Sequence, residues 1–180
     1  MLVLMPSRTL SRRLKVSADT VADKPTDHPM AKWCARDFRL GTWQVVLFMN
    51  PETTLSIVMD AAPYGTLVDR FREFLPAYFE NLGWDDVHEI LGPTLSAGVE
   101  FRKNTDRSMT GLMNKLVMDL SYYDFSDRDV GSINSFLLKY LLGGKRPDGY
   151  EYPITRFHRW LETASPASGL KLVWSKSDGS

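Results

Sequence analysis

The stretch TWQVVLFM, residues 42–49, constrains the fold more than any other part of the chain. At the two-residue period of a strand, Trp43, Val45 and Leu47 point to one side. Val46 and Phe48 point to the other side. Large apolar residues on both sides are typical of a central strand whose two faces are covered. The sequence therefore predicts a sheet with other elements packed against it.

The segments around this strand complete the sheet. CARDFRL before it and TLSIVMD after it are rich in β-branched and aromatic residues, with Gly41 and the turn NPETT between them. We expect these three strands to form an antiparallel meander. MLVLMP at the start and AGVEFRKN at residues 97–104 are further strand candidates. The prediction is an α+β fold with a mostly antiparallel sheet of four or five strands and helices packed on at least one face.

Three longer segments have helical periodicity. Residues 67–82 carry an apolar stripe, with Thr66 as the expected cap, Gly83 as the stop and Pro76 as a kink. A second helix is expected from Arg107, and a third between Ser126 and Gly143. A short helix follows the first strand, with Ser7 placed to cap it. We predict a single domain over residues 1–163 and a flexible or loosely docked tail over residues 164–180. Residues 17–30 are predicted as a surface loop or mobile linker.

Composition excludes several classes of protein. Twenty-two basic residues balance 22 acidic ones, so no overall charge attracts nucleic acid or an anionic membrane. No run of 18 apolar residues occurs, and no membrane association is expected. Cys34 is the single cysteine and is expected to be buried, which fits a soluble protein of the reducing cytoplasm.

Metal and cofactor signatures are missing from the sequence. His28, His88 and His158 lie far apart, and none has a second ligand at metal-binding spacing. Asp85 and Asp86 follow Gly83 and Trp84 in a pattern typical of a turn, where aspartate is favoured for backbone bonding alone. We therefore predict no metal, no cofactor and no catalytic set.

The stretch NTDRSMTGLMNKL, residues 104–116, concentrates polar residues at a helix start. Asp106 or Ser108 can cap the helix. Arg107 stands at the unfavourable end of the helix dipole, and Gly111 lies inside the helix, where glycine costs about 1 kcal/mol relative to alanine. Packing explains Gly111 if another segment approaches closely there, with Asn114 bonded to the backbone of that segment.

A binding interpretation competes with this packing interpretation. Asn104, Arg107, Ser108 and Asn114 would then form an anion site, with Arg107 as the clamp. We expect the entrance at Arg107 to be mostly sealed, which favours packing. In that case Asn114→Ala would leave a buried partner unsatisfied and cost about 1–3 kcal/mol.

One basic cluster has no acidic neighbour. Arg8, Arg12, Arg13 and Lys15 precede the first acidic residue, Asp19. They would lie on one short helix and could contact phosphates, although a solvated helix face is the favoured explanation.

Several segments together resemble a known family. DRSMTGLMN, VVLFMNPETTLSIVM, TLSRRLKV and YEYPITRF are similar to segments of small bacterial and archaeal proteins grouped as a domain of unknown function, over roughly residues 2–160. The most specific part falls on Arg107, Ser108, Gly111 and Asn114. Here Asp106 replaces the usual Asn, and Lys115 replaces the usual acidic residue. The resemblance implies the order of the fold and a prokaryotic origin, and it implies no reaction.

Three functional hypotheses follow. The first is a non-enzymatic binding or protein-interaction domain, motivated by five tryptophans in a chain without an assembled acid, base or metal set. The second is an enzyme acting on a small anionic or phosphorylated substrate at Arg107, which would need His158 as a base. The third is weak nucleic-acid binding through the Arg8 to Lys15 face.

Overall fold

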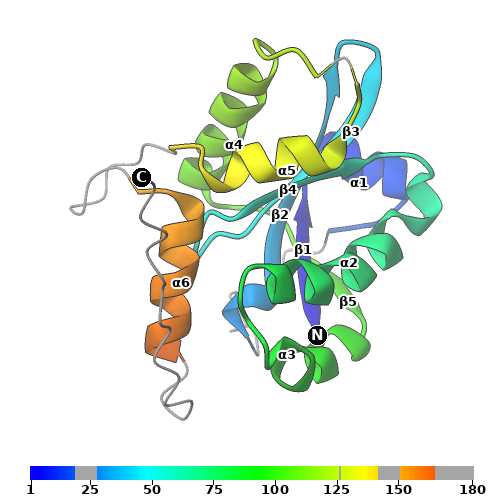
Figure 1. The fold of residues 1–180 in the computed structure, drawn as a ribbon. Coiled ribbons are helices and arrows are strands. Elements are labelled where there is room, and N and C mark those ends of the chain that lie inside the picture. Colours follow the sequence, from blue (N-terminus) through cyan, green and yellow to red (C-terminus); the bar gives the residue numbers. More distant parts are fainter. Residues whose placement is uncertain (19–27, 126, 142–150, 165–180) are drawn as a thin grey trace, which may run out of the picture.

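The computed structural model describes residues 1–18, 28–125, 127–141 and 151–164. Within them, one five-stranded mixed sheet carries helices on both faces (Figure 1). The strands are β1 (Leu2–Pro6), β2 (Lys32–Leu40), β3 (Trp43–Met49), β4 (Ser56–Asp60) and β5 (Val99–Phe101). The α-helices are α1 (Arg8–Leu14), α2 (Leu67–Asn81), α3 (Val87–Ser96), α4 (Arg107–Leu120), α5 (Val130–Leu138) and α6 (Pro153–Ala164). Two short 3-10 helices, η1 (Pro29–Ala31) and η2 (Tyr64–Thr66), precede β2 and α2.

The strand order in the sheet is β4-β3-β2-β1-β5. The expected meander is confirmed, because β2, β3 and β4 pair antiparallel. β1 is parallel to both of its neighbours, β2 and β5. The antiparallel ladders are the longer ones, so the predicted α+β class with a mostly antiparallel sheet is confirmed, with a parallel part that local patterns do not reveal.

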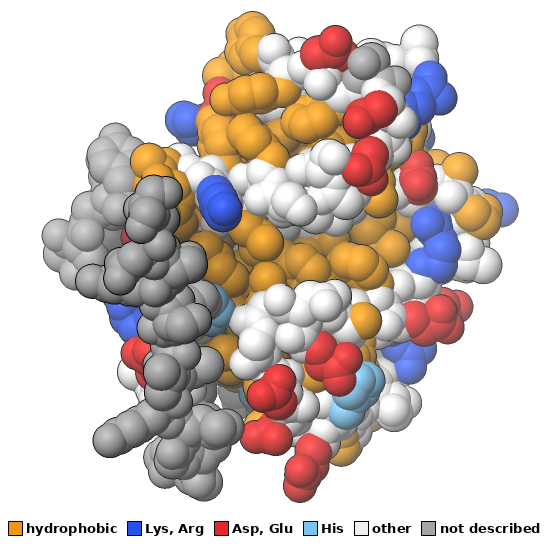
Figure 2. Space-filling model, viewed as in Figure 1, with side chains coloured by type: hydrophobic (Ala, Val, Ile, Leu, Met, Phe, Trp, Pro, Cys, Tyr) orange, Lys and Arg blue, Asp and Glu red, His pale blue; other side chains and the backbone are white. Residues whose placement is uncertain are grey.

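Two separate apolar cores lie on the two faces of the sheet. On one face, α1, α2, α3 and α6 pack against side chains that include Val46 and Phe48. On the other, α4 and α5 pack against Val45 and Leu47. Figure 2 shows hydrophobic side chains in a band between these layers, with most charged side chains toward the outside. The prediction that the strand at 42–49 is covered on both faces is confirmed.

Helix boundaries agree with the sequence in part. Ser7 caps α1 by accepting the N–H of Leu10, and Gly83 follows α2 with a positive φ of 89°. Thr66, the expected cap of α2, makes no capping bond; its hydroxyl donates to the carbonyl of Pro63 instead.

The third helix starts later than predicted. α5 begins after Asp129, whose carboxylate accepts the N–H groups of Gly131 and Ser132 at 2.9 and 3.1 Å. A carboxylate is a strong cap at the positive end of a helix, so this position begins the helix. Ser126 and Gly143 lie outside the described residues, as do residues 19–27 of the predicted loop and 165–180 of the predicted tail. Helices α3 and α6 were not predicted.

Asn50 anchors the turn between β3 and β4 to the start of β2. It is fully buried. Its amide nitrogen donates to the carbonyls of Pro29 and Lys32, both at 3.0 Å. Its Oδ1 accepts the N–H of Glu52 and both the N–H and hydroxyl of Thr53. One side chain therefore satisfies buried backbone groups from two segments that are distant in sequence.

Asn134 serves the outer side of β4 in a comparable way. From α5, its Oδ1 accepts the N–H of Val58 at 2.7 Å and its Nδ2 donates to the carbonyl of Val58 at 3.1 Å. Asn134 is buried. Its amide thus pairs with both backbone groups of one edge-strand residue.

We expect Asn50→Ala to lower the free energy of unfolding by about 3 kcal/mol or more. The substitution leaves several buried donors and acceptors without a hydrogen-bond partner, and each such group costs about 1–3 kcal/mol. Urea denaturation followed by circular dichroism measures this loss. Asn81→Ala is the control: Asn81 is exposed at the end of α2, and its loss should stay below about 0.5 kcal/mol. Similar losses in both variants would contradict the anchoring role of Asn50.

Candidate functional site

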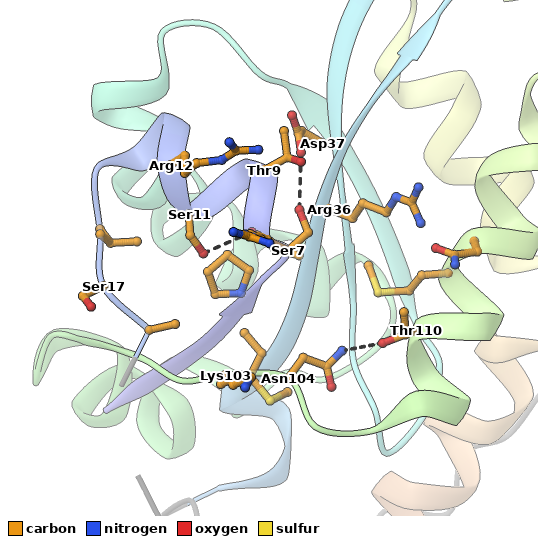
Figure 3. A pocket seen from close by; sticks show the side chains of 18 residues that line it. Ser7, Thr9, Ser11, Arg12, Ser17, Arg36, Asp37, Lys103, Asn104 and Thr110 are labelled. Carbon is orange, nitrogen blue, oxygen red and sulfur yellow. Dashed lines mark hydrogen bonds between the residues drawn. The ribbon is translucent and has the colours of Figure 1, made fainter. Parts of the chain in front are cut away.

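A cavity of about 820 Å³ lies where β1 ends. Met5 and Pro6 from the end of β1 and Ser7, the N-cap of α1, line it. Lys103 and Asn104, which follow β5, line it from the neighbouring strand. α1 and α4 flank the cavity on its two sides (Figure 3).

The topology accounts for this space. β1 and β5 are adjacent and parallel, so their carboxyl ends meet at one edge of the sheet. The helix after β1 packs on one face through Leu10. The helix after β5 packs on the opposite face through Met113. Helices that leave neighbouring parallel strands toward opposite faces leave a crevice above the strand ends, which is where open α/β sheets bind ligands.

β2 supplies the next part of the wall, because it continues past the end of β1. The register pairs Pro6 with Ala35, so Arg36 and Asp37 extend beyond the last paired residue. Arg36 is opposite Leu47, which faces the α4 and α5 core, so Arg36 shares that face. Asp37 therefore points to the α1 face. Adjacent residues of β2 thus reach both sides of the cavity.

The charged lining is mostly cationic. Arg8, Arg12, Arg36 and Lys103 line the cavity, and within the described part of the chain none of their side chains has a hydrogen bond or ion pair. Asp37 is the one carboxylate among the described lining residues, and its side chain is only 4% exposed.

The charge of Asp37 is already matched from outside the cavity. Arg13 Nε lies 3.1 Å from Asp37 Oδ2, and the Ser7 hydroxyl donates to Oδ1 at 3.4 Å. These contacts fasten α1 to β2. Among the described residues, therefore, no carboxylate pairs with any of the four cations that line the cavity.

Uncharged polar groups occupy the rest of the wall. Figure 3 shows Ser11 and Arg12 on the α1 side, with Asn104 and Thr110 on the α4 side. Asn104 Nδ2 donates to the Thr110 hydroxyl at 3.2 Å, and Asn104 Oδ1 accepts the N–H of Asp106 at 2.9 Å. Hydroxyls and amides that both donate and accept suit a hydroxylated ligand.

Two residue sets that the sequence analysis kept apart meet in this cavity. Arg8 and Arg12 come from the basic cluster, and Asn104 and Asn114 come from the stretch before and within α4. Arg36, Asp37 and Lys103 also line the cavity, and Arg36 and Asp37 were not predicted as site residues. In the sequence, Arg36 and Asp37 are two charged residues within an otherwise largely apolar strand, and nothing there indicates a binding site.

The other predicted site residues lie elsewhere. Arg107 and Ser108 are exposed in the first turn of α4 and are not part of the cavity lining. Arg13 bonds Asp37, and its guanidinium lies 5.3 Å from the centre of the Tyr64 ring. Lys15 forms the C-cap of α1.

The expected sealed entrance around Gly111 and Asn114 is wrong. A Cβ added at Gly111 would have no atom within 4 Å, so no segment approaches it closely. Asn114 is exposed, and its side chain makes no hydrogen bond within the described residues. The flank of α4 faces the open cavity, which removes the need for a packing partner. The cap is confirmed, because Asp106 accepts the N–H of Met109 at 3.0 Å.

The three histidines have separate structural surroundings. His28 accepts the N–H of Met30 and stacks on Trp84, and burial lowers its pKa. His88 lies 3.0 Å from Glu80, and His158 Nε2 lies 2.8 Å from the carbonyl of Leu82. The described residues contain no group of three or more His, Cys, Asp or Glu side chains that could hold a metal ion.

His158 and Arg107 are not brought together. The buried residue of α6, which carries His158, belongs to the same apolar core as those of α2 and α3, and α6 also contacts α5. Arg107 begins α4, whose buried residues belong to the other core. The enzyme hypothesis that joins these two residues stays a prediction, and their positions in different cores do not favour it.

Four of the five tryptophans lie in the described residues, and they belong to the core. Trp33, Trp43 and Trp84 are buried, and Trp160 packs partly buried against the same core as Trp84. Trp174 lies outside the described residues. The described tryptophans thus contribute to the core, so their number alone does not support a protein partner.

Comparison with known proteins gives one match. The sequence model of a family described as a domain of unknown function (DUF6933) matches residues 4–156. The chain belongs to this family. No curated protein and no solved structure matches it. The DUF6933 match runs from β1 into α6 and includes every described residue that lines the cavity.

No helix among the described residues of this DUF6933 member has the length and apolar character needed to cross a membrane.

We expect Asn114→Ala to change the free energy of unfolding by less than about 0.5 kcal/mol, since an exposed side chain without a described partner is removed. Asp106→Ala, on the same helix, should cost about 1 kcal/mol through loss of the cap. Chemical denaturation of the two variants makes the comparison. A larger loss for Asn114→Ala would show that its amide holds a buried partner after all.

Proposed function

We propose that this domain is a non-enzymatic binding protein that holds a small anionic molecule in the cavity between α1 and α4. The observation that carries the proposal is the convergence of Arg8, Arg12, Arg36 and Lys103 on one concave space without described counter-charges. Like charges gathered in a cavity repel one another, and an anion bound among them removes that repulsion. The volume of about 820 Å³ is within the usual range for small-molecule sites.

The arrangement favours binding over catalysis. A general base has to be free to take a proton from its substrate. Asp37 is the carboxylate in the described lining, and Arg13 and Ser7 already engage it. The remaining polar groups are hydroxyls, amides and cations, which orient and neutralise a ligand.

The arrangement also favours a small ligand over nucleic acid. Of the basic cluster, Arg8 and Arg12 face a cavity flanked by α4, whereas Arg13 is bound to Asp37. Proteins usually bind a nucleic-acid backbone with an extended row of cations on an open surface, aligned with the phosphates. The four cations here line a single cavity instead.

We also propose that the protein acts in the cytoplasm of a prokaryotic cell. Cys34 is a free, buried thiol, and burial raises its pKa to about 12. It is therefore kept as a neutral, unreactive side chain. A lone free thiol is common in proteins of reducing compartments.

A thermal-shift measurement with pyrophosphate tests the binding proposal. A ligand at 100 times its Kd stabilises by about 2.7 kcal/mol, which raises the Tm of a chain of this size by roughly 5–10 °C. Glucose, uncharged and of similar size, should give no shift. Raising the salt concentration should reduce the effect of pyrophosphate.

Matched arginine variants locate the site. Arg12→Ala and Arg36→Ala should reduce the pyrophosphate shift and leave the Tm of the unliganded protein nearly unchanged, because neither side chain has a described partner. Arg107→Ala is the control, since Arg107 is exposed outside the cavity. The proposal fails if pyrophosphate gives no shift, or if Arg107→Ala removes it as fully as Arg12→Ala.

A further inference from the structure

We infer that the ligand has two phosphoryl groups joined by a hydroxyl-bearing carbon skeleton, as in a sugar bisphosphate. This inference rests on the proposed function and specifies the chemistry of the same cavity. Three features carry it: the amount of positive charge, its division between two walls, and the character of the groups between those walls.

The amount of charge exceeds what one phosphoryl group neutralises. Four cations line the cavity, and Arg13 compensates Asp37 from outside. One phosphoryl monoester carries a charge of about −1.5 to −2 at pH 7. Two such groups are needed to balance Arg8, Arg12, Arg36 and Lys103.

Three of the four cations are divided between two walls. Arg8 and Arg12 project from α1, whereas Arg36 lies on the face of β2 that carries α4. Figure 3 shows Arg12 on the α1 side and the Arg36 side chain extending toward α4. Because these side chains start from opposite faces of the sheet, two anionic groups set apart on one molecule match them better than one.

The groups between the walls suit hydroxyls. The hydroxyl hydrogens of Ser11 and Thr110 are donated to the carbonyls of Ser7 and Asp106, so these oxygens can accept from a ligand, whereas Asn104 and Asn114 offer amide N–H donors. The hydroxyl groups of a sugar both donate and accept, so they can pair with both kinds of group. A polyol chain between two phosphoryl groups would use them.

A nucleotide fits this lining poorly. Bases are usually held by stacking on aromatic side chains. The described lining residues include no Phe, Tyr, Trp or His. The apolar contacts come from small or flexible side chains such as Met5, Ala35 and Met113, which support a carbon skeleton and offer no flat surface for a base.

Isothermal titration calorimetry on the full chain tests the inference. The probes are two pairs, fructose bisphosphate with fructose monophosphate and ribulose bisphosphate with ribulose monophosphate, together with ADP. We expect at least one bisphosphate to bind about tenfold or more tighter than its monophosphate, equivalent to about 1.4 kcal/mol. It should also bind more tightly than ADP.

Variants assign each phosphoryl group to its wall. Arg12→Ala and Arg36→Ala should each lower bisphosphate affinity about tenfold. The matching monophosphate should lose affinity in one of these variants and not in the other, because it occupies a single wall. Arg107→Ala should bind all probes as the parent does.

The outcomes separate this inference from the function on which it rests. Equal affinities for bisphosphate and monophosphate, both lowered by Arg12→Ala, would overturn the two-phosphoryl ligand and leave the anion-binding function standing. Preference for ADP would overturn the ligand class in the same way. If no phosphorylated probe binds and pyrophosphate gives no thermal shift, both proposals fail.

Discussion

Every residue of β3 except Gln44 is buried, and the rest of the structure depends on this two-sided burial. A strand without a solvent face needs a helical layer on each side of its sheet. The chain meets that need by sending α1 to one face and α4 to the other, from two strands that lie next to each other. The crevice at the ends of β1 and β5 is a geometric result of covering both faces.

The crevice acquires its chemistry from a short helix. α1 has seven residues, too few to be stable in isolation. The contacts that hold it include the buried side chain of Leu10, the Ser7 cap and the Arg13–Asp37 ion pair. Because Arg13 anchors the helix, Arg8 and Arg12 are left to face the cavity. One helix thus combines an arginine that fixes its position with two that supply positive charge.

The sequence predicts what depends on neighbours along the chain. The meander and the core stripe of α4 follow from periods of two and 3.6, and the caps at Ser7 and Asp106 follow from local bonding. The parallel pairing of β1 with β2 and β5 joins distant segments, and no local pattern specifies it. α3 escaped prediction because Gly92 and Pro93 lie inside it, and both residues normally argue against a helix.

Individual residues of the candidate site could be predicted, but their meeting could not, because it depends on contacts between segments that are distant in sequence. Arg8, Arg12, Asn104 and Asn114 stand out by composition, but their meeting depends on the adjacency of β1 and β5. Arg36 resembles an ordinary solvent-facing residue of a strand until the register shows that β1 ends beside it. Asn114 flanks an apolar stripe, which is equally compatible with a packed neighbour and with an open cavity.

The Asn134 side chain has a consequence for how copies of this protein meet one another. β4 is an outer strand of the sheet, and such a strand usually presents free N–H and C=O groups on which a second chain can add a strand. At Val58 both groups are already bonded to the amide of Asn134, which imitates a neighbouring peptide group, while α5 lies alongside. β5, the opposite outer strand, has only three residues. Asn134 thereby blocks strand addition at Val58, and the shortness of β5 leaves few backbone groups for a second chain at the opposite margin.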